Sequence, residues 1–452
     1  MATETVERQG YFTGWTLKRE GIIAPEERLP WGQTIFVGLQ HVLAMFGATV
    51  LAPIIMGFNP NTAIFFSGIG TIIFFLIVGG RVPSYLGSSF SFIAVVLVAE
   101  GATHNIPVAL GGIIAAGVVY GIIALIVIFT GYQWIEYLMP PVVTGVVVAA
   151  IGLNLAPTAI SEATHSPFDT WMALITVLAV AVVAVYFPGP TRRLPILLGG
   201  IIGYLIYLLF ANGFGYGTPI NFTNLEKAAW IGLPVFTTPV FQASAMVLIA
   251  PVAIILVAEN LGHVKAVAAM TGRNLDKYLG RAFLGDAVAS FVTASGGGTG
   301  LTTYAENIGV MAVSRIYSTL IFIIAAVFAI LLGFCPKFGA LIVTIPQGVL
   351  GGLAIVLFGL IAATGGRIWV QNQVDFSKSR NLITAAVALT MGAGNFTLSI
   401  GNFTMGGIAT ATFSAIIIYQ VLREREPKPE EIASSDSAVG LNPTEPQPGA
   451  GQ

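Results

Sequence analysis

The sequence predicts an all-α polytopic membrane protein with about fourteen transmembrane segments. Of its 452 residues, 55% are hydrophobic and only 9% are charged, whereas a soluble globular chain carries roughly 25% charge. Its 53 glycines and 24 prolines would weaken soluble helices but suit the close packing of membrane helices. The composition therefore favours a chain that is solvated largely by lipid.

Apolar stretches of spanning length follow one another along most of the chain, since a span needs about 20 apolar residues. We place these spans at 32–55, 61–80, 107–130, 136–156, 168–187, 195–213, 243–265, 280–294, 315–335, 338–364, 380–396 and 402–422. Two further segments, 86–100 and 300–313, are short and irregular and bring the count to about fourteen. Asp286 and Pro346 interrupt two of the spans.

The basic residues predict the orientation of the chain. If the N-terminus is cytoplasmic and the spans alternate, all 20 Lys and Arg residues except Lys227 and Lys337 lie inside, as the positive-inside rule requires. We therefore expect residues 1–30 to form a cytoplasmic N-terminal tail. Residues 424–452 are rich in Pro, Glu and Ser and are expected to form a disordered cytoplasmic tail.

The two short segments resemble each other, which suggests an internal repeat. Ser88-Ser89-Phe90-Ser91-Phe92-Ile93 and Thr302-Thr303-Tyr304-Ala305-Glu306-Asn307-Ile308 both carry two hydroxyl residues, an aromatic and a small residue before an apolar helix. If they are equivalent, repeats at 31–230 (spans 1–7) and 231–423 (spans 8–14) each hold seven spans and are inverted in the membrane. Matched interrupted segments in inverted repeats indicate a binding site near the midplane. The two segments are expected to pair as a short antiparallel ladder with a half-helix after each; the alternative is that glycines 296–301 form only a loop.

Two carboxylates lie in apolar surroundings where each costs about 2.5–3.5 kcal/mol. Glu306 stands where a half-helix begins, so it can accept hydrogen bonds from ring N–H groups of a ligand, or it can merely cap its own backbone. Glu259 lies four residues before His263, on the same helical face. That pair can bind a substrate N–H and exchange a proton, although a buried histidine that only bonds to a neighbouring helix remains an alternative.

Other polar residues carry weaker signals. Gln40 and His41 must face the bundle interior and are interpreted as supporting the site, with direct substrate contact as an alternative. Asp286 is interpreted as a polar gate contact near the inner end of its span. A single cysteine, Cys335, excludes an intrachain disulfide. The chain has no phosphate-binding GxxxxGK[ST] loop, HExxH motif or Cys/His cluster, so we expect no catalytic residues, no metal, no cofactor and no nucleic-acid partner.

Several motifs resemble the nucleobase–ascorbate transporter family, also called nucleobase cation symporter family 2. ENIGVMAVSR (306–315) is similar to the family signature Q/E/P-N-x-G-x-x-x-x-T-R/K/G, with Ser314 in place of the threonine. Gln40-His41 in LQHVLAMFGATVLAP looks like the Gln-His motif of the first span. VPSYLGSSFSFI (82–93), VAENLGH (257–263) and TTYAENIGVMAVSRIYS (302–318) are close to the bacterial uracil permeases. The similarity covers residues from about 30 to 422.

This resemblance implies a 7+7 inverted repeat divided into a core domain (spans 1–4 and 8–11) and a gate domain (spans 5–7 and 12–14). It implies that Glu259 and Glu306 hold the base through their side chains, that the backbone N–H groups of Phe90 and Ala305 meet its carbonyl oxygens, and that His263 couples transport to protons. We also expect Tyr304 at the substrate. The supporting residues are expected to be Gln40, His41, Ala48, Asn307, Ser89 and Phe358.

We therefore expect a proton-coupled uracil symporter of the bacterial inner membrane, with both termini cytoplasmic and alternating access between the two domains. Ala305 stands where close uracil permeases carry glycine. Alanine makes φ > 0 unfavourable at this position, so a substrate base somewhat different from uracil remains an alternative. A xanthine or urate carrier is the first alternative, and an anion channel or exchanger of related architecture is a remote one. A homodimer and Na⁺ coupling remain open. A membrane enzyme is disfavoured, because no nucleophile–base or metal constellation is present.

Overall fold

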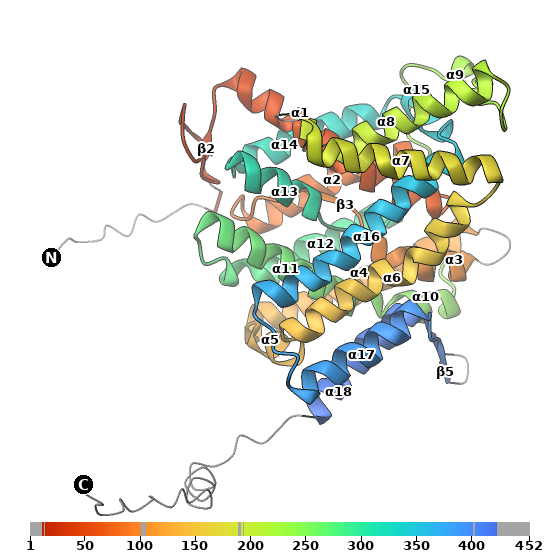
Figure 1. Ribbon diagram of the computed structural model, residues 1–452. Coiled ribbons are helices and arrows are strands. Elements are labelled where there is room, and N and C mark those ends of the chain that lie inside the picture. The colour runs from red at the N-terminus through yellow and green to blue at the C-terminus, as the bar shows by residue number, and fades with distance from the viewer. Residues whose placement is uncertain are drawn as a thin grey trace, which may run out of the picture.

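The computed structural model describes residues 11–12, 14–100, 105–188, 191–192, 194–400 and 403–422 (Figure 1). Residues 1–10 and the expected disordered tail, 424–452, lie outside this range. Within it, eight helices are long and apolar enough to cross a membrane, or nine if one bent pair counts as a single span. The prediction of an all-helical, multi-span membrane protein is confirmed, while fewer helices than the fourteen expected segments reach full spanning length.

The first half of the chain begins with a short arm and continues through helices of very different lengths. Its elements are β1 (Thr16–Leu17), β2 (Glu27–Arg28), α1 (Trp31–Ile55), α2 (Pro60–Val78), β3 (Leu86–Ser88), the 3₁₀ turn η1 (Phe90–Phe92), α3 (Ile93–Glu100), α4 (Ile106–Thr130), α5 (Gln133–Leu138), α6 (Pro141–Ala163), α7 (Pro167–Tyr186), α8 (Pro195–Leu208), the π turn η4 (Leu209–Gly213) and α9 (Thr223–Lys227). Five of these helices have proline in their first two positions, where its missing N–H costs nothing.

The second half contains an equivalent strand followed by a short helix. Its elements are α10 (Ala243–Ile249), α11 (Val252–Thr271), η5 (Asp276–Tyr278), α12 (Leu279–Ser295), β4 (Leu301–Thr303), α13 (Ala305–Ser314), α14 (Thr319–Gly333), α15 (Pro336–Val343), α16 (Gln347–Gln371), α17 (Ser379–Ala393), β5 (Leu398–Ile400), β6 (Phe403–Met405) and α18 (Gly407–Val421).

Prolines set several boundaries differently from those expected. The single span predicted at 338–364 is wrong, because α15 ends before Pro346 and α16 starts directly after it. α14 and α15 meet at an angle of 82°, and Pro336 opens α15. The span predicted at 136–156 is also shifted, since Pro140 and Pro141 separate α5 from α6. Proline favours an extended conformation in the residue before it and so ends the preceding helix.

Close packing joins the helices in two sets of neighbours. α16 runs along α6 and α7, and α17 packs on α6 and α18; in the other set α12 packs on α2 and α4, and α14 on α1 and α2. In Figure 1, α6 and α16 lie side by side, with α17 and α18 below them. Glycine permits the closest of these contacts, since a Cβ at Gly365 of α16 would collide with the backbone carbonyl of Gly145 on α6.

The two short strands pair as the sequence predicts. β3 and β4 form an antiparallel ladder in which Leu86 faces Thr303, Gly87 faces Thr302 and Ser88 faces Leu301. All six of these residues are buried, so their backbone groups must be satisfied inside the protein. The ladder achieves this for residues 301–303, whereas the glycines at 296–300 lie in the turn and loop that lead into β4.

Candidate functional site

Hydroxyl groups hold the strand pair in place from both sides. The side-chain oxygens of Ser88 and Thr299 lie 2.5 Å apart. On α12, Ser290 accepts a hydrogen bond from the Leu301 amide at 2.9 Å and donates to the Leu301 carbonyl at 3.1 Å. Because these side chains satisfy backbone groups in an apolar interior, they favour one fixed position for the broken segments.

A half-helix starts directly after each strand. η1 begins at Phe90 and continues into α3, and α13 begins at Ala305. The first N–H groups of a helix have no carbonyl within that helix to bond to, and they lie at the positive end of its dipole. The backbone amides of Phe90 and Ala305 are the first N–H groups of these two half-helices.

Ala305 is compatible with this backbone. The described non-glycine residues with positive φ are Arg315, Gln373 and Asn395, so Ala305 is not held in the left-handed region. The unfavourable conformation expected for alanine at this position is therefore absent. Compared with glycine at this position, Ala305 therefore adds only a methyl group to the start of α13.

Helix α11 contacts both broken segments, through Glu259 and His263. Glu259 accepts hydrogen bonds from the hydroxyl of Ser89 at 3.3 Å and from that of Ser91 at 3.4 Å. One turn later, Nδ1 of His263 lies 2.9 Å from Oγ1 of Thr303. α11 thus reaches the first segment through its glutamate and the second through its histidine.

Glu306 lies in the first turn of α13. It is partly exposed, as are Glu259 and His263, whereas the adjacent Asn260 and Asn307 are fully buried. Glu306 and Glu259 are close enough to interact electrostatically. Each carboxyl group is partly exposed and can accept hydrogen bonds.

Most of the predicted supporting residues lie on elements next to the strand pair. Asn307 Nδ2 lies 3.0 Å from His41 Nδ1 and donates to the His41 carbonyl at 3.1 Å. The Tyr304 hydroxyl donates to the Ser88 carbonyl at 3.0 Å. It accepts from Thr49, next to the buried Ala48, at 3.2 Å.

Two other predicted residues are placed differently. The ring of Phe358 meets that of Phe90 edge to face with centroids 5.8 Å apart, so α16 touches the first half-helix. Gln40 is buried, and its Nε2 has no hydrogen-bond partner among the described residues. Phe358 therefore contacts the first half-helix, whereas for Gln40 the described residues show burial without a hydrogen-bond partner for its Nε2.

Asp286 belongs to the buried interior and is not the gate contact expected from its place in the sequence. It is fully buried on α12 and accepts a hydrogen bond from Nδ2 of Asn260, the residue that follows Glu259. Its other oxygen, Oδ1, has no partner among the described residues. The free-energy cost of a carboxylate in an apolar span drew attention to Glu259 and Glu306 in the sequence. The same cost applies to Asp286, so the sequence already contained a signal for this residue.

The arrangement combines hydrogen-bond acceptors with hydrogen-bond donors. Carboxylates and first-turn amides present acceptors and donors side by side, which suits a small planar molecule with both kinds of group. In the described part of the chain, no group of three or more His, Cys, Asp or Glu side chains is placed to hold a metal ion.

Comparison with known proteins yields matches over nearly the whole chain. A family model described as "Permease family" matches residues 32–401. The chain is 58% identical over 433 residues to the "Putative pyrimidine permease RutG" of Escherichia coli K12, covering 93% of this chain and 98% of that protein. It is 40% identical over 413 residues to the uracil permease of Paenibacillus larvae, covering 88% and 96%. It is 38% identical over 430 residues to the uracil permease of Escherichia coli K12, covering 92% and 98%.

Solved structures with little sequence identity share the fold. The structure of SLC26A9 matches with a TM-score of 0.63 at 13% identity and covers 87% of this chain and 66% of that one. The transmembrane domain of the cyanobacterial bicarbonate transporter BicA matches with a TM-score of 0.59 at 18% identity, covering 86% and 97%. At these identities the likeness concerns the fold alone.

Proposed function

Because the chain belongs to the Permease family, the nucleobase–ascorbate transporters whose motifs it carries, we propose that it imports uracil together with a proton. It is a transporter and not an enzyme. The names of its relatives, a pyrimidine permease and several uracil permeases, support a pyrimidine as the substrate.

One observation carries this proposal: α11 contacts both broken segments, through Glu259 and His263. Uracil alternates N–H donors with carbonyl acceptors around one ring. The carboxylates of Glu259 and Glu306 receive its N–H groups, while the amides of Phe90 and Ala305 donate to its carbonyl oxygens. The site thus matches the hydrogen-bonding pattern of the base, and an unpaired group on a wrong base would cost about 1–3 kcal/mol.

Proton coupling is assigned to His263, the titratable residue that contacts the second broken segment through Thr303. Protonation of the imidazole changes which partners it can bond to and so links the position of β4 to the proton. One charge moving through about 100 mV gains about 2.3 kcal/mol, which supports roughly 45-fold accumulation.

Alternating access follows from an arrangement of fourteen segments in two inverted repeats of seven. The shorter helices complete this number as broken or tilted segments. In this proposal, the core that holds the site comprises α1–α4 and α10–α14, and the gate comprises α6–α8 and α16–α18. The close packing of α12 with α2 and α4, and of α16 with α6 and α7, supports this division. The excess of Lys and Arg on one side supports both termini in the cytoplasm and a place in the bacterial inner membrane.

A nucleobase panel tests the substrate class directly. Thermal shift of the purified protein is measured with uracil, thymine, cytosine, xanthine and urate, for the wild type and for Glu306→Gln. Glu226→Gln, on the exposed helix α9, is the matched control. We expect stabilisation by uracil in the wild type and the control and its loss in Glu306→Gln. Stabilisation by xanthine or urate but not uracil would identify a purine carrier.

A further inference from the structure

The two broken segments are related by a two-fold symmetry that extends beyond their ladder. Directly after β3, the Ser89 amide donates to the Gly300 carbonyl at 2.9 Å. Directly after β4, the Tyr304 amide donates to the Tyr85 carbonyl at 3.0 Å. Because Gly300 and Tyr85 are the residues that precede the two strands, each half of the chain makes the same bond to the other.

One hydroxyl group from the preceding helix holds the first residue of each strand. Thr71 on α2 accepts a hydrogen bond from the Leu86 amide at 2.9 Å and donates its own proton to the Ser67 carbonyl at 2.8 Å. Ser290 on α12 accepts a hydrogen bond from the Leu301 amide, also at 2.9 Å, and donates to the Leu301 carbonyl at 3.1 Å. The same contact is therefore made twice, once in each half.

The buried strands depend on these two acceptors. In a two-stranded antiparallel ladder, alternate amides point away from the partner strand and need an acceptor elsewhere. Leu86 and Leu301 are fully buried, and Thr71 and Ser290 are 1% and 0% exposed, so bulk water does not reach these amides. The Leu301 side chain also lies so close to Gly70 that a Cβ there would collide with it, which prevents β4 from moving toward α2. Each hydroxyl therefore fixes the start of its strand.

The fixed residues lead directly to the two half-helices. Leu86 lies four residues before Phe90, and Leu301 lies four residues before Ala305. The symmetric backbone bonds hold the other end of each strand. Binding groups need to be held within about 0.5 Å by supporting hydrogen bonds of this kind. A strand that is held at both ends keeps the amide that follows it in one position.

We propose that Thr71 and Ser290 are a matched pair of positioning residues for a pyrimidine base. Through β3 and β4 they aim the amides of Phe90 and Ala305 at its two carbonyl oxygens. This role rests on the proposed function of the site and deepens it. The two carboxyl groups of the site recognise the N–H groups of the base, whereas the two hydroxyls, acting through the strands, determine its preference for carbonyl oxygen.

Variants that remove each hydroxyl at nearly constant volume test this role. Thr71→Val and Ser290→Ala remove the acceptor, whereas Thr71→Ser keeps it. Thr412→Val is the matched control, because Thr412 is buried on α18 and its hydroxyl donates to the Ile408 carbonyl at 2.8 Å, a bond within the helix like that of Thr71. Thermal unfolding of the purified full-length protein reports whether each variant is folded.

The ligands are uracil, 2-thiouracil and 4-thiouracil. Each thio analogue keeps both N–H groups and replaces one carbonyl oxygen with sulfur, which is a weak hydrogen-bond acceptor. The ratio of uracil affinity to analogue affinity therefore measures the contact of an amide with that oxygen. A variant that is merely less stable binds all three ligands more weakly to the same extent and leaves the ratio unchanged.

The wild type should bind uracil about ten times more tightly than at least one analogue, since a lost hydrogen bond to a buried amide has a cost of this order. Thr71→Val and Ser290→Ala should each lose about ten-fold in uracil affinity and most of this preference, while Thr71→Ser and Thr412→Val should retain both. Each hydroxyl-free variant is an independent test, so one that folds is enough to decide.

Retention of the wild-type preference in either hydroxyl-free variant would overturn the proposal. Equal binding of the three ligands by the wild type would overturn it as well, because the amides would then not recognise the carbonyl oxygens. A wild type that binds none of the three ligands would instead overturn the proposed function.

Discussion

The tight contact between Gly87 and Tyr304 provides a test of the site geometry. A Cβ at Gly87 would lie 2.5 Å from both Cε2 and the hydroxyl of Tyr304, far inside van der Waals contact. The ring cannot turn away freely, because its hydroxyl is bonded to Ser88 and Thr49. We therefore expect Gly87→Ala to displace Tyr304 and, with it, the adjacent amide of Ala305.

The expected cost follows from the groups that must move. Overpacking a filled interior costs about 1–3 kcal/mol, and each of the two lost hydrogen bonds adds about 0.5–1.5 kcal/mol. Gly87→Ala should therefore destabilise the protein by about 2–6 kcal/mol. Because the start of α13 moves with Tyr304, uracil affinity should fall at least ten-fold, or by about 1.4 kcal/mol.

Thermal unfolding and uracil titration of the purified protein measure the two effects. The control is Gly309→Ala on α13, where a Cβ meets no atom within 4 Å and alanine favours the helix by about 0.5–1 kcal/mol. The control should be at least as stable as the wild type and should bind uracil normally. Wild-type stability and affinity in Gly87→Ala would refute the predicted role of the β3–β4 contact.

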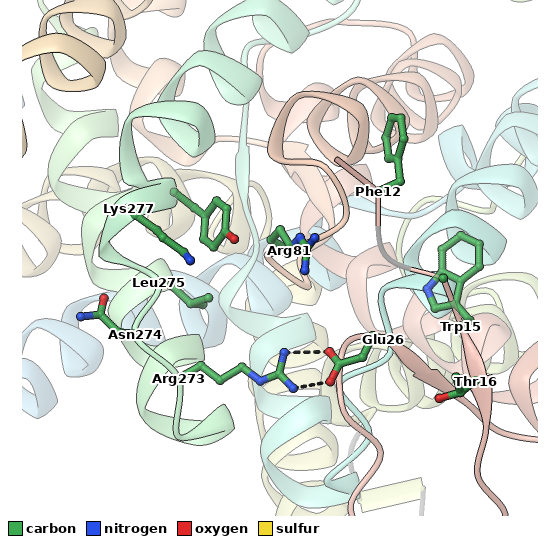
Figure 2. A pocket seen from close by; sticks show the side chains of 11 residues that line it. Phe12, Trp15, Thr16, Glu26, Arg81, Arg273, Asn274, Leu275 and Lys277 are labelled. Atoms are coloured by element: carbon green, nitrogen blue, oxygen red, sulfur yellow. Dashed lines mark hydrogen bonds and ion pairs between the residues drawn. The ribbon is translucent and has the colours of Figure 1, made fainter. Parts of the chain in front are cut away.

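Three further predictions concern single charges. Glu306→Gln should abolish uracil binding or shift the preference toward purines, and unchanged uptake would remove Glu306 from the site. His263→Ala should spare uracil exchange more than uphill accumulation, whereas equal loss of both would contradict a coupling role. Arg273 lowers the pKa of Glu26. Their ion pair (Figure 2) should therefore stabilise the N-terminal arm at pH values above the ordinary carboxyl pKa, and this stabilisation should be lost as the pH falls through the lowered pKa. Hydrogen exchange of residues 14–29, corrected for intrinsic rates, should rise on acidification in the wild type, and Arg273→Gln should remove this pH dependence.

The strand pair could be predicted because its signals are local. Two hydroxyl residues, an aromatic residue and a small residue precede each half-helix, and poor helix formers such as Thr303 favour an extended backbone. Glu259 and Glu306 are visible for the same reason, since a single carboxylate in an apolar stretch has a known cost. That the two carboxylates lie near the same pair of strands, however, depends on the pairing of β3 with β4, which are more than 200 residues apart in the chain.

Features that depend on tertiary contacts could not be predicted. Hydropathy alone reads the apolar run around Pro346 as one span; the proline is a local signal for the break, but the angle of 82° between α14 and α15 depends on the fold. Asp286 carries the same local signal as Glu259 and Glu306, but its hydrogen bond with Asn260 depends on the packing of α12 against α11. The N-terminal arm reads as a polar tail because its anchors, including the bond from Trp15 to Thr319, join residues that are distant in the chain.

Uptake of labelled uracil into proteoliposomes with an imposed pH gradient tests the central claim most directly. With the outside acidic, the wild type should accumulate uracil above equilibrium, and a proton ionophore should abolish the accumulation. Glu306→Gln should show no uptake, while Glu226→Gln should behave as the wild type. Equal uracil accumulation with and without the pH gradient would contradict proton coupling. A wild-type protein that transports no uracil would contradict the proposed function.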